Sequence, residues 1–302
     1  MDESTVASHP AVGQADPENM LPPEVRSAAY RRRPIGVFDS GLGGLTVVKE
    51  LVDRLPHESI LYFGDTARVP YGTKSPETIC RFSREAGRFL LGRGVKMIVV
   101  ACNTASAYAL NDLESKVAVP VLGVVAAGAR AAHRASESGR IGVIGTTGTI
   151  ASGAYERAVR TLRPVVEVHA QACPLFVPLV EEGLAHHAAA RLIAEDYLAP
   201  LCALGIDTLV LGCTHYPALR QLIGDVMGPG VRLIDSAEET ATDVAEVLRE
   251  HDLLAPCSQR PVRVFSVSDL PLRFRHVGRL LIGDMIDAVE RVEVEGNLSA
   301  TV

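Results

Sequence analysis

The chain has 302 residues, more than a single hydrophobic core usually serves, and its 47% hydrophobic residues can fill two cores. A formal net charge of −6 and a pI near 5.9 leave no broad basic surface, so we expect no nucleic-acid partner. No apolar stretch approaches the roughly 20 residues that span a bilayer, so we expect no membrane protein either.

The first 33 residues differ from the rest of the chain. They are rich in Pro, Ser, Glu and Ala, show no helical or strand periodicity, and carry acidic residues from Asp2 onward. They have neither the apolar centre of a secretory signal nor the acid-poor composition of a transit peptide. We therefore predict a disordered extension over residues 1–33 and a cytoplasmic protein.

From residue 34 onward, apolar strands alternate with helices. The strands are predicted at 34–38, 59–64, 96–101, 119–124, 140–144, 165–170 and 208–212, and helices at 45–54, 76–93, 151–162 and 188–204. This alternation is typical of parallel sheets covered by helices, and it predicts the α/β class. Helices that follow Gly-rich loops offer free N–H groups to an anion, so a small acidic ligand would suit them.

The pattern of strand, Gly-rich loop and helix occurs twice. IGVFDSGLGG begins at Ile35 and IGVIGTTGT at Ile141, an offset of 106 residues, and Cys102 and Cys213 are 111 residues apart. These offsets indicate an internal repeat of domain-sized halves. The first loop is neither a dinucleotide fingerprint nor a P-loop, and Asp39 and Ser40 could simply cap the helix that follows.

Each half also places a cysteine where a buried strand ends, in IVVACNTASA at Cys102 and LVLGCTHYPA at Cys213. Two opposed thiols could remove a proton from one face of a stereocentre and deliver one to the other. A thiol has an ordinary pKa of about 8.5, so acting as a base near neutral pH requires a neighbour that favours the thiolate. Asp39 and His215 are the candidate neighbours.

The remaining cysteines have simpler interpretations. Cys80, Cys173, Cys202 and Cys257 are predicted to be buried thiols without a disulfide framework. Cys213 and His215 could ligate a metal, but no partner pair stands at a suitable spacing, so we expect none.

Five motifs in order, GVFDSGLGGLTV, YFGDTARVPYG, ACNTASA, PLFVPLVEEG and GCTHYPAL, closely resemble those of the glutamate racemase family in the aspartate/glutamate racemase superfamily. The resemblance covers roughly residues 34 to 290. It implies two similar parallel-sheet α/β domains related by pseudo-two-fold symmetry, with the active site in the cleft between them. One domain would comprise residues 34–126 plus 236–302, and the other residues 127–235.

The resemblance also implies the catalytic roles. Cys102 would take the proton from D-glutamate, assisted by Asp39, and Cys213 would take it from L-glutamate, assisted by His215. Glu181 would orient His215, with Glu182 as the solvated neighbour. No cofactor is implied, so a closed cleft rich in hydrogen-bond donors must stabilise the carbanion-like charge.

Substrate contacts follow from the same motifs. The residues expected to hold glutamate through backbone and side-chain groups are Asp39, Ser40, Tyr71, Gly72, Asn103, Thr104, Thr146, Thr147 and Thr214. His186 and His187 match no motif and are expected on the surface. The resemblance further implies D-glutamate supply for bacterial peptidoglycan synthesis and a homodimer.

Three other functions remain open from the residues. A racemase of the same superfamily could act on aspartate or a related dicarboxylate, because two thiols do not set the length of the substrate. The chain could instead be a carboxylate-binding protein with inert cysteines, or a metal hydrolase that uses Cys213 and His215. Thiol reactivity and metal content distinguish these alternatives.

Overall fold

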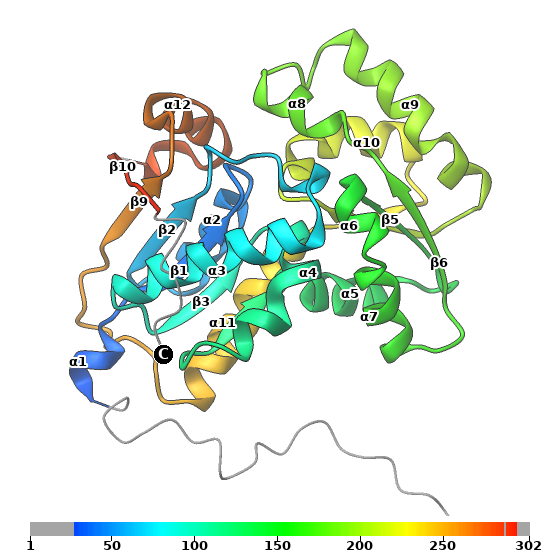
Figure 1. Cartoon of the computed structure of the whole chain (residues 1–302). Coiled ribbons are helices and arrows are strands. Elements are labelled where there is room, and N and C mark those ends of the chain that lie inside the picture. Colours follow the sequence, from blue (N-terminus) through cyan, green and yellow to red (C-terminus); the bar gives the residue numbers. More distant parts are fainter. Residues whose placement is uncertain (1–26, 287, 295–302) are drawn as a thin grey trace, which may run out of the picture.

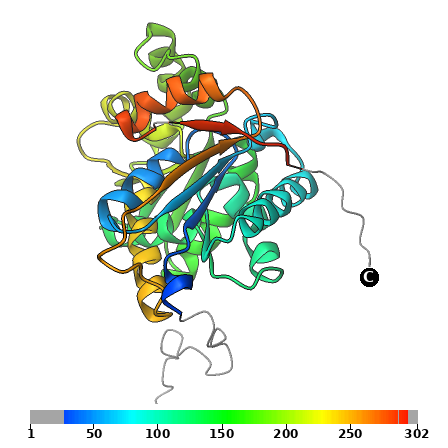
Figure 2. The same cartoon turned by 90° about the vertical axis from the view of Figure 1, so that its left-hand side faces the viewer.

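The computed structural model describes residues 27–286 and 288–294. It contains two parallel β-sheets, each flanked by helices (Figure 1). The larger sheet has the strand order β10-β9-β2-β1-β3-β4. Its strands are β1 (Ile35–Asp39), β2 (Ile60–Gly64), β3 (Met97–Val100), β4 (Val121–Gly123), β9 (Arg263–Val267) and β10 (Val289–Arg291). The C-terminal strands β9 and β10 thus extend the sheet beyond β2 (Figure 2).

The smaller sheet repeats part of the larger one. It comprises β5 (Arg140–Gly145), β6 (Glu167–Ala172), β7 (Thr208–Gly212) and β8 (Arg232–Ile234) in the order β6-β5-β7-β8. This second-first-third-fourth order is also that of β2-β1-β3-β4. The predicted α/β class with two parallel sheets is confirmed, and the repeat seen in the sequence reappears in the strand order.

Helices connect the strands and cover both faces of each sheet (Figure 1). They are α1 (Ala28–Arg31), α2 (Leu45–Arg54), η3 (Tyr71–Thr73), α3 (Pro76–Gly92), α4 (Asn103–Glu114), α5 (Val124–Ala135), α6 (Thr147–Ala151), α7 (Ala154–Leu162), α8 (Phe176–Glu181), α9 (Ala188–Ala203), η4 (Tyr216–Leu219), α10 (Arg220–Met227), α11 (Ser236–Glu250), α12 (Pro271–Ile282) and η5 (Gly283–Met285). None of these helices is long and apolar enough to cross a membrane.

Burial of apolar side chains fixes these layers. The central strands β1, β2, β3 and β7 are buried along their whole length, so their side chains pack into cores on both faces of the sheets. On one face of the larger sheet, α2, α11 and α12 share a core, and α3 and α4 pack on the other. The smaller sheet packs α8, α9 and α10 on one face and α5 and α7 on the other.

The N-terminal prediction needs one correction. Residues 1–26 of the expected disordered extension lie outside the described residues, but Ala28–Arg31 form a helical turn. Ser27 caps this turn by accepting a hydrogen bond from the Tyr30 N–H, and the buried Lys96 Nζ donates to the Arg31 carbonyl at 2.8 Å. These contacts order residues 27–31, because Lys96, distant in the chain, donates a hydrogen bond to a backbone carbonyl of the helical turn.

Two further differences concern the second half and the cysteines. The helix expected at 151–162 begins three residues later, as α7, and Ala151 instead ends the separate helix α6, since Gly153 adopts a left-handed φ of 63° between them. Cys173 is buried and Cys80 half-buried, but Cys202 and Cys257 are exposed, so the prediction of buried thiols was wrong for these two. Cys202 belongs to α9, and Cys257 lies in the loop between α11 and β9.

Candidate active site

The two sheets place the carboxyl ends of corresponding strands around one cavity. Cys102 follows β3 and Cys213 follows β7, the third strand of each repeat. Both thiols line the cavity, which is bounded by Ser40, Val69, Pro70, Tyr71, Gly72, Cys102, Asn103, Thr104, Thr146, Val177, Cys213, Thr214 and His215. Loops after parallel strands commonly build such sites, since all the strands of a parallel sheet end at one edge.

Cys102 is the N-cap residue of α4 and is 5% exposed. Its Sγ lies 3.5 Å from the Ser40 hydroxyl and accepts the Ala105 N–H at 3.5 Å. Burial, followed by the negative charge of Asp39, raises the pKa of Cys102 to about 12, although both hydrogen bonds oppose this rise. Cys102 is therefore a neutral thiol at physiological pH.

Cys213 has a cationic neighbour instead. Its Sγ lies 3.8 Å from His215 Nδ1, and His215 Nε2 lies 3.1 Å from Glu181 Oε1. Burial alone lowers the pKa of His215, but hydrogen bonds and charges from Cys213 and Glu181 outweigh it and raise that pKa to about 10. An imidazolium beside the sulfur stabilises a thiolate.

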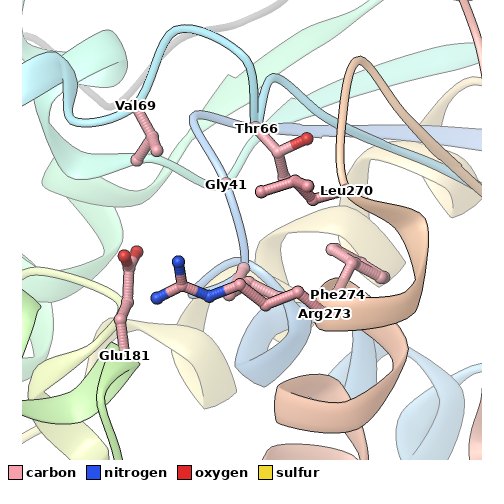
Figure 3. A pocket seen from close by; sticks show the side chains of 8 residues that line it. Gly41, Thr66, Val69, Glu181, Leu270, Arg273 and Phe274 are labelled. Carbon is pink, nitrogen blue, oxygen red and sulfur yellow. The ribbon is translucent and has the colours of Figure 1, made fainter.

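Glu181 holds this imidazole from the end of α8. Burial raises the pKa of Glu181, but the hydrogen bond and charge of His215, with the charge of Arg273, lower it below its ordinary value. Figure 3 shows Glu181 and Arg273 facing each other across a second pocket beside the cavity. The adjacent Glu182 is exposed and pairs with Arg273 at 2.7 Å, so it takes the solvated position expected for it.

Asp39 ends β1 and is fully buried. Its Oδ2 accepts the Gly41 N–H at 2.8 Å, and its Oδ1 accepts the Thr214 hydroxyl at 3.4 Å from the other half of the repeat. The N-cap position of α2 is Gly44, which has no side-chain cap, so Asp39 organises the preceding loop. Burial raises the pKa of Asp39, against the opposing effect of His215, which makes this carboxylate a better proton acceptor.

Hydroxyl and amide groups supply the remaining polar lining. The Oγ1 atoms of Thr104, Thr146 and Thr149 lie 3.0 Å from one another, and join α4 to the start of α6. Asn103 is 2% exposed, and its Oδ1 accepts the Tyr155 hydroxyl at 2.6 Å. Neutral donors of this kind can bind an anionic ligand.

Tyr71 and Gly72 belong to η3, a single helical turn in the connection that follows β2. The Tyr71 hydroxyl donates to Asp65 Oδ2 at 2.5 Å, and Arg68 Nε donates to the same oxygen at 2.7 Å. Ser268, in the loop before α12, donates to Asp65 Oδ1 at 3.0 Å. The C-terminal segment therefore helps to fix the loop that carries Tyr71.

Most of the predicted site residues meet at the cavity, with three exceptions. Asp39 is buried behind the lining, Glu181 reaches His215 from the second pocket, and Thr147 is exposed. His186 and His187 are exposed, as expected.

The sequence analysis missed four residues of this region. Val69, Pro70 and Val177 line the cavity, and Thr149 joins the threonine cluster. Val69 and Pro70 stand within the ARVPYG segment, and Thr149 within GTTGT, so their neighbours in the sequence were the available signal.

Known proteins resemble this chain along most of its length. The family model for Asp/Glu/Hydantoin racemase matches residues 35–244. A glutamate racemase of Geobacter metallireducens is 54% identical over 263 residues, which cover 87% of this chain and 97% of that protein.

Solved structures give the same result. A glutamate racemase of Bacillus anthracis has a TM-score of 0.84 at 42% identity, with 87% of this chain and 98% of that chain covered. One of Francisella tularensis, in complex with D-glutamate, has a TM-score of 0.83 at 40% identity, with 88% and 99% covered. The chain therefore belongs to the Asp/Glu/hydantoin racemase family and, within it, to the glutamate racemases.

Proposed function

We propose that the protein interconverts L- and D-glutamate without a cofactor, with Cys102 and Cys213 alternating as base and acid. The product, D-glutamate, would supply peptidoglycan synthesis. The observation that carries this proposal is the placement of two thiols on one cavity, each at the end of the corresponding strand of a repeat. Such a pair can address both faces of one α-carbon, as racemisation requires.

In the L-to-D direction, Cys213 acts as the base. Its thiolate, paired with the His215 imidazolium, takes the α-proton of L-glutamate, and the thiol of Cys102 delivers a proton to the opposite face. The enzyme then carries a Cys213 thiol and a Cys102 thiolate. D-glutamate reverses both transfers, and Asp39 is the carboxylate that assists Cys102.

The cavity must also hold the substrate and stabilise charge at its α-carbon. The N-terminus of α4, directly after Cys102, presents the positive end of a 12-residue helix to this region. Asn103, Thr104, Thr146 and Thr214 offer neutral donors to the carboxylates of glutamate. The negative charge of Asp39, buried behind this lining and bonded to Thr214, favours the ammonium group. Preorganised donors of this kind stabilise a developing carbanion where solvent is excluded.

The test is proton exchange in D₂O with purified protein and no added cofactor. L-glutamate and D-glutamate are each expected to lose optical activity while deuterium enters the α-position, followed by circular dichroism and NMR. Cys102→Ala and Cys213→Ala should each reduce racemisation by at least about 10⁴-fold, since each removes one of the two proton carriers.

Parallel assays separate the alternatives. Racemisation of aspartate and not glutamate would keep the two-thiol chemistry and overturn the substrate. A carboxylate-binding protein would bind glutamate without any exchange. Loss of activity on treatment with a chelator, together with stoichiometric bound metal, would point to the hydrolase alternative.

A homodimer and a cytoplasmic location complete the proposal. Leu270 and Leu272 at the start of α12 are 54% and 75% exposed, which offers apolar surface to a second copy. All six cysteines are free thiols, which suits a reducing compartment. Light scattering of the purified protein should give twice the mass of the chain, and cell fractionation tests the location.

A further inference from the structure

Tyr155 connects the surroundings of the two thiols, although no motif gave it a role. It belongs to α7 and is 3% exposed. Its hydroxyl donates to Oδ1 of Asn103, the residue after Cys102. Its ring lies against Gly212, the residue before Cys213, since a Cβ at Gly212 would lie 3.1 Å from the ring carbon Cε2.

The ring occupies a slot formed by two glycines. A Cβ at Gly128 in α5 would come within 3.0 Å of the Tyr155 hydroxyl oxygen, and one at Gly212 would press on the opposite edge of the ring. Because both positions are glycine, the Tyr155 ring can pack directly against α5 and the end of β7. Because this close packing holds the ring, the position of the hydroxyl is set independently of Asn103.

The amide of Asn103 is left with its donor side free. Asn103 lines the cavity and is 2% exposed, and its Oδ1 is occupied by Tyr155. Among the residues that the structure describes, Nδ2 of Asn103 is buried and has no hydrogen-bond partner. An unpaired buried amide is unfavourable by about 1–3 kcal/mol, so this position suits a ligand that accepts hydrogen bonds.

We propose that Tyr155 is a positioning residue, whose hydroxyl holds the Asn103 amide so that its Nδ2 donates to a carboxylate of the bound glutamate. This inference rests on the proposed function. Without the tyrosine donor, the amide can rotate and present its oxygen to an anion, which repels it. Burial raises the pKa of Tyr155 further above its ordinary value, so the hydroxyl remains a protonated donor at physiological pH.

Tyr155→Phe removes this hydroxyl and keeps the ring. We expect the KM for both enantiomers to rise about tenfold, because a hydrogen bond to a charged group is weakened. The kcat should change less than KM, since the carboxylate is held in the ground state and the transition state alike. The matched control is Tyr216→Phe, which removes another buried hydroxyl, donated to the Cys173 carbonyl at 2.8 Å, and should leave KM unchanged.

A double-mutant cycle with Asn103→Ala shows whether Tyr155 acts through the amide. Once Asn103 is absent, Tyr155→Phe should cause no further rise in KM, so the double variant should match Asn103→Ala alone. Additive effects, or an unchanged KM in Tyr155→Phe, would overturn the inference. An unchanged KM in Asn103→Ala would also overturn it, while racemisation by the wild-type enzyme would leave the proposed function intact.

Two further measurements test the inference even if a variant loses its activity or fails to fold. Calorimetric Kd values for D-glutamate repeat the same cycle without catalysis, so a failure of the proposed racemisation does not hide the result. A structure of the wild-type protein with D-glutamate needs no variant. It should show Asn103 Nδ2 within hydrogen-bond distance of a carboxylate, and a substrate bound without that contact would refute the assignment.

Discussion

At the scale of single residues, the two thiols have opposite electrostatic surroundings. Cys102 lies near the buried carboxylate of Asp39, which raises the pKa of the thiol, and Cys213 lies beside the His215 imidazole, whose pKa is raised. Cys102 therefore holds its proton, as the acid in the L-to-D direction of the proposed mechanism requires. The ammonium group of a bound substrate would offset the charge of Asp39 and reduce this asymmetry.

Glu181→Gln is predicted to lower the pKa of His215 from about 10, because it replaces the carboxylate partner of Nε2 with a neutral amide. Titration of ¹⁵N-histidine-labelled protein by NMR measures this pKa, and the His215→Asn variant assigns the signal. Glu182→Gln is the matched control, since Glu182 is exposed and pairs with Arg273. Equal shifts in the two glutamate variants would contradict the prediction.

The same pair makes folding stability depend on pH. The pKa of His215 is raised from 6.5 to about 10 by folding, so its contribution is fully present below pH 6.5 and is lost as the pH rises through 10. The free energy of unfolding of the wild type relative to Glu181→Gln should therefore decline between these values. Chemical denaturation at a series of pH values measures it, and a difference that grows with pH would oppose this account.

At the scale of elements, close contact between the loops at the strand ends forms the cavity. A Cβ at Gly43, in the loop between β1 and α2, would lie 2.2 Å from Thr214 Oγ1 and 2.8 Å from His215 Nδ1. A Cβ at Gly72 would lie 2.4 Å from the Cβ of Thr146. Glycine at these two positions allows the two halves of the repeat to meet.

Gly43→Ala is predicted to reduce kcat/KM by about 100-fold, because the added methyl must displace the side chains beside Cys213. Gly92→Ala, in the exposed last turn of α3, has no atom within 4 Å of its added Cβ and serves as the control. It should keep full activity and gain up to about 1 kcal/mol of stability. Steady-state assays and thermal unfolding distinguish these effects, and full activity in Gly43→Ala would show that the loops can separate freely.

At the scale of the whole molecule, the thiol of Cys102 and a buried ion pair lie at opposite ends of the larger sheet. Lys96, directly before β3, is fully buried and pairs with Glu58 at 2.5 Å. Its Nζ also donates to the carbonyls of Arg31 and Leu253, each at 2.8 Å. Lys96 thus joins the N-terminal segment and the chain after α11 to the end of the sheet remote from the thiols.

Lys96→Met is predicted to destabilise the fold by about 3–5 kcal/mol, because it leaves the Glu58 carboxylate buried without its partner. The double variant Lys96→Met, Glu58→Leu should recover much of this loss, since no buried charge remains. Denaturant unfolding measures both, and KM for glutamate should stay unchanged under folding conditions. A stable single variant with altered KM would contradict this division between the ends of the sheet.

The sequence by itself determined the α/β class, the repeat and the strand ends that carry Cys102 and Cys213, because these depend on local periodicity and on the order of motifs. The assignment of Glu181 and Glu182 also followed from a motif, and the structure places Glu181 on His215 and Glu182 in solvent. Local patterns are informative here since a strand end and its loop lie within a few residues of each other.

The tertiary structure alone decided the contacts between distant segments. The resemblance placed residues 236–302 in the first domain, but no strand was predicted there, and the structure pairs β9 with β2 and β10 with β9. Lys96 is buried, although an isolated lysine would be expected in solvent. Tyr155 meets Asn103 because α7 packs into the slot at Gly128 and Gly212. No local pattern encodes these contacts, since each depends on how separate elements pack against one another.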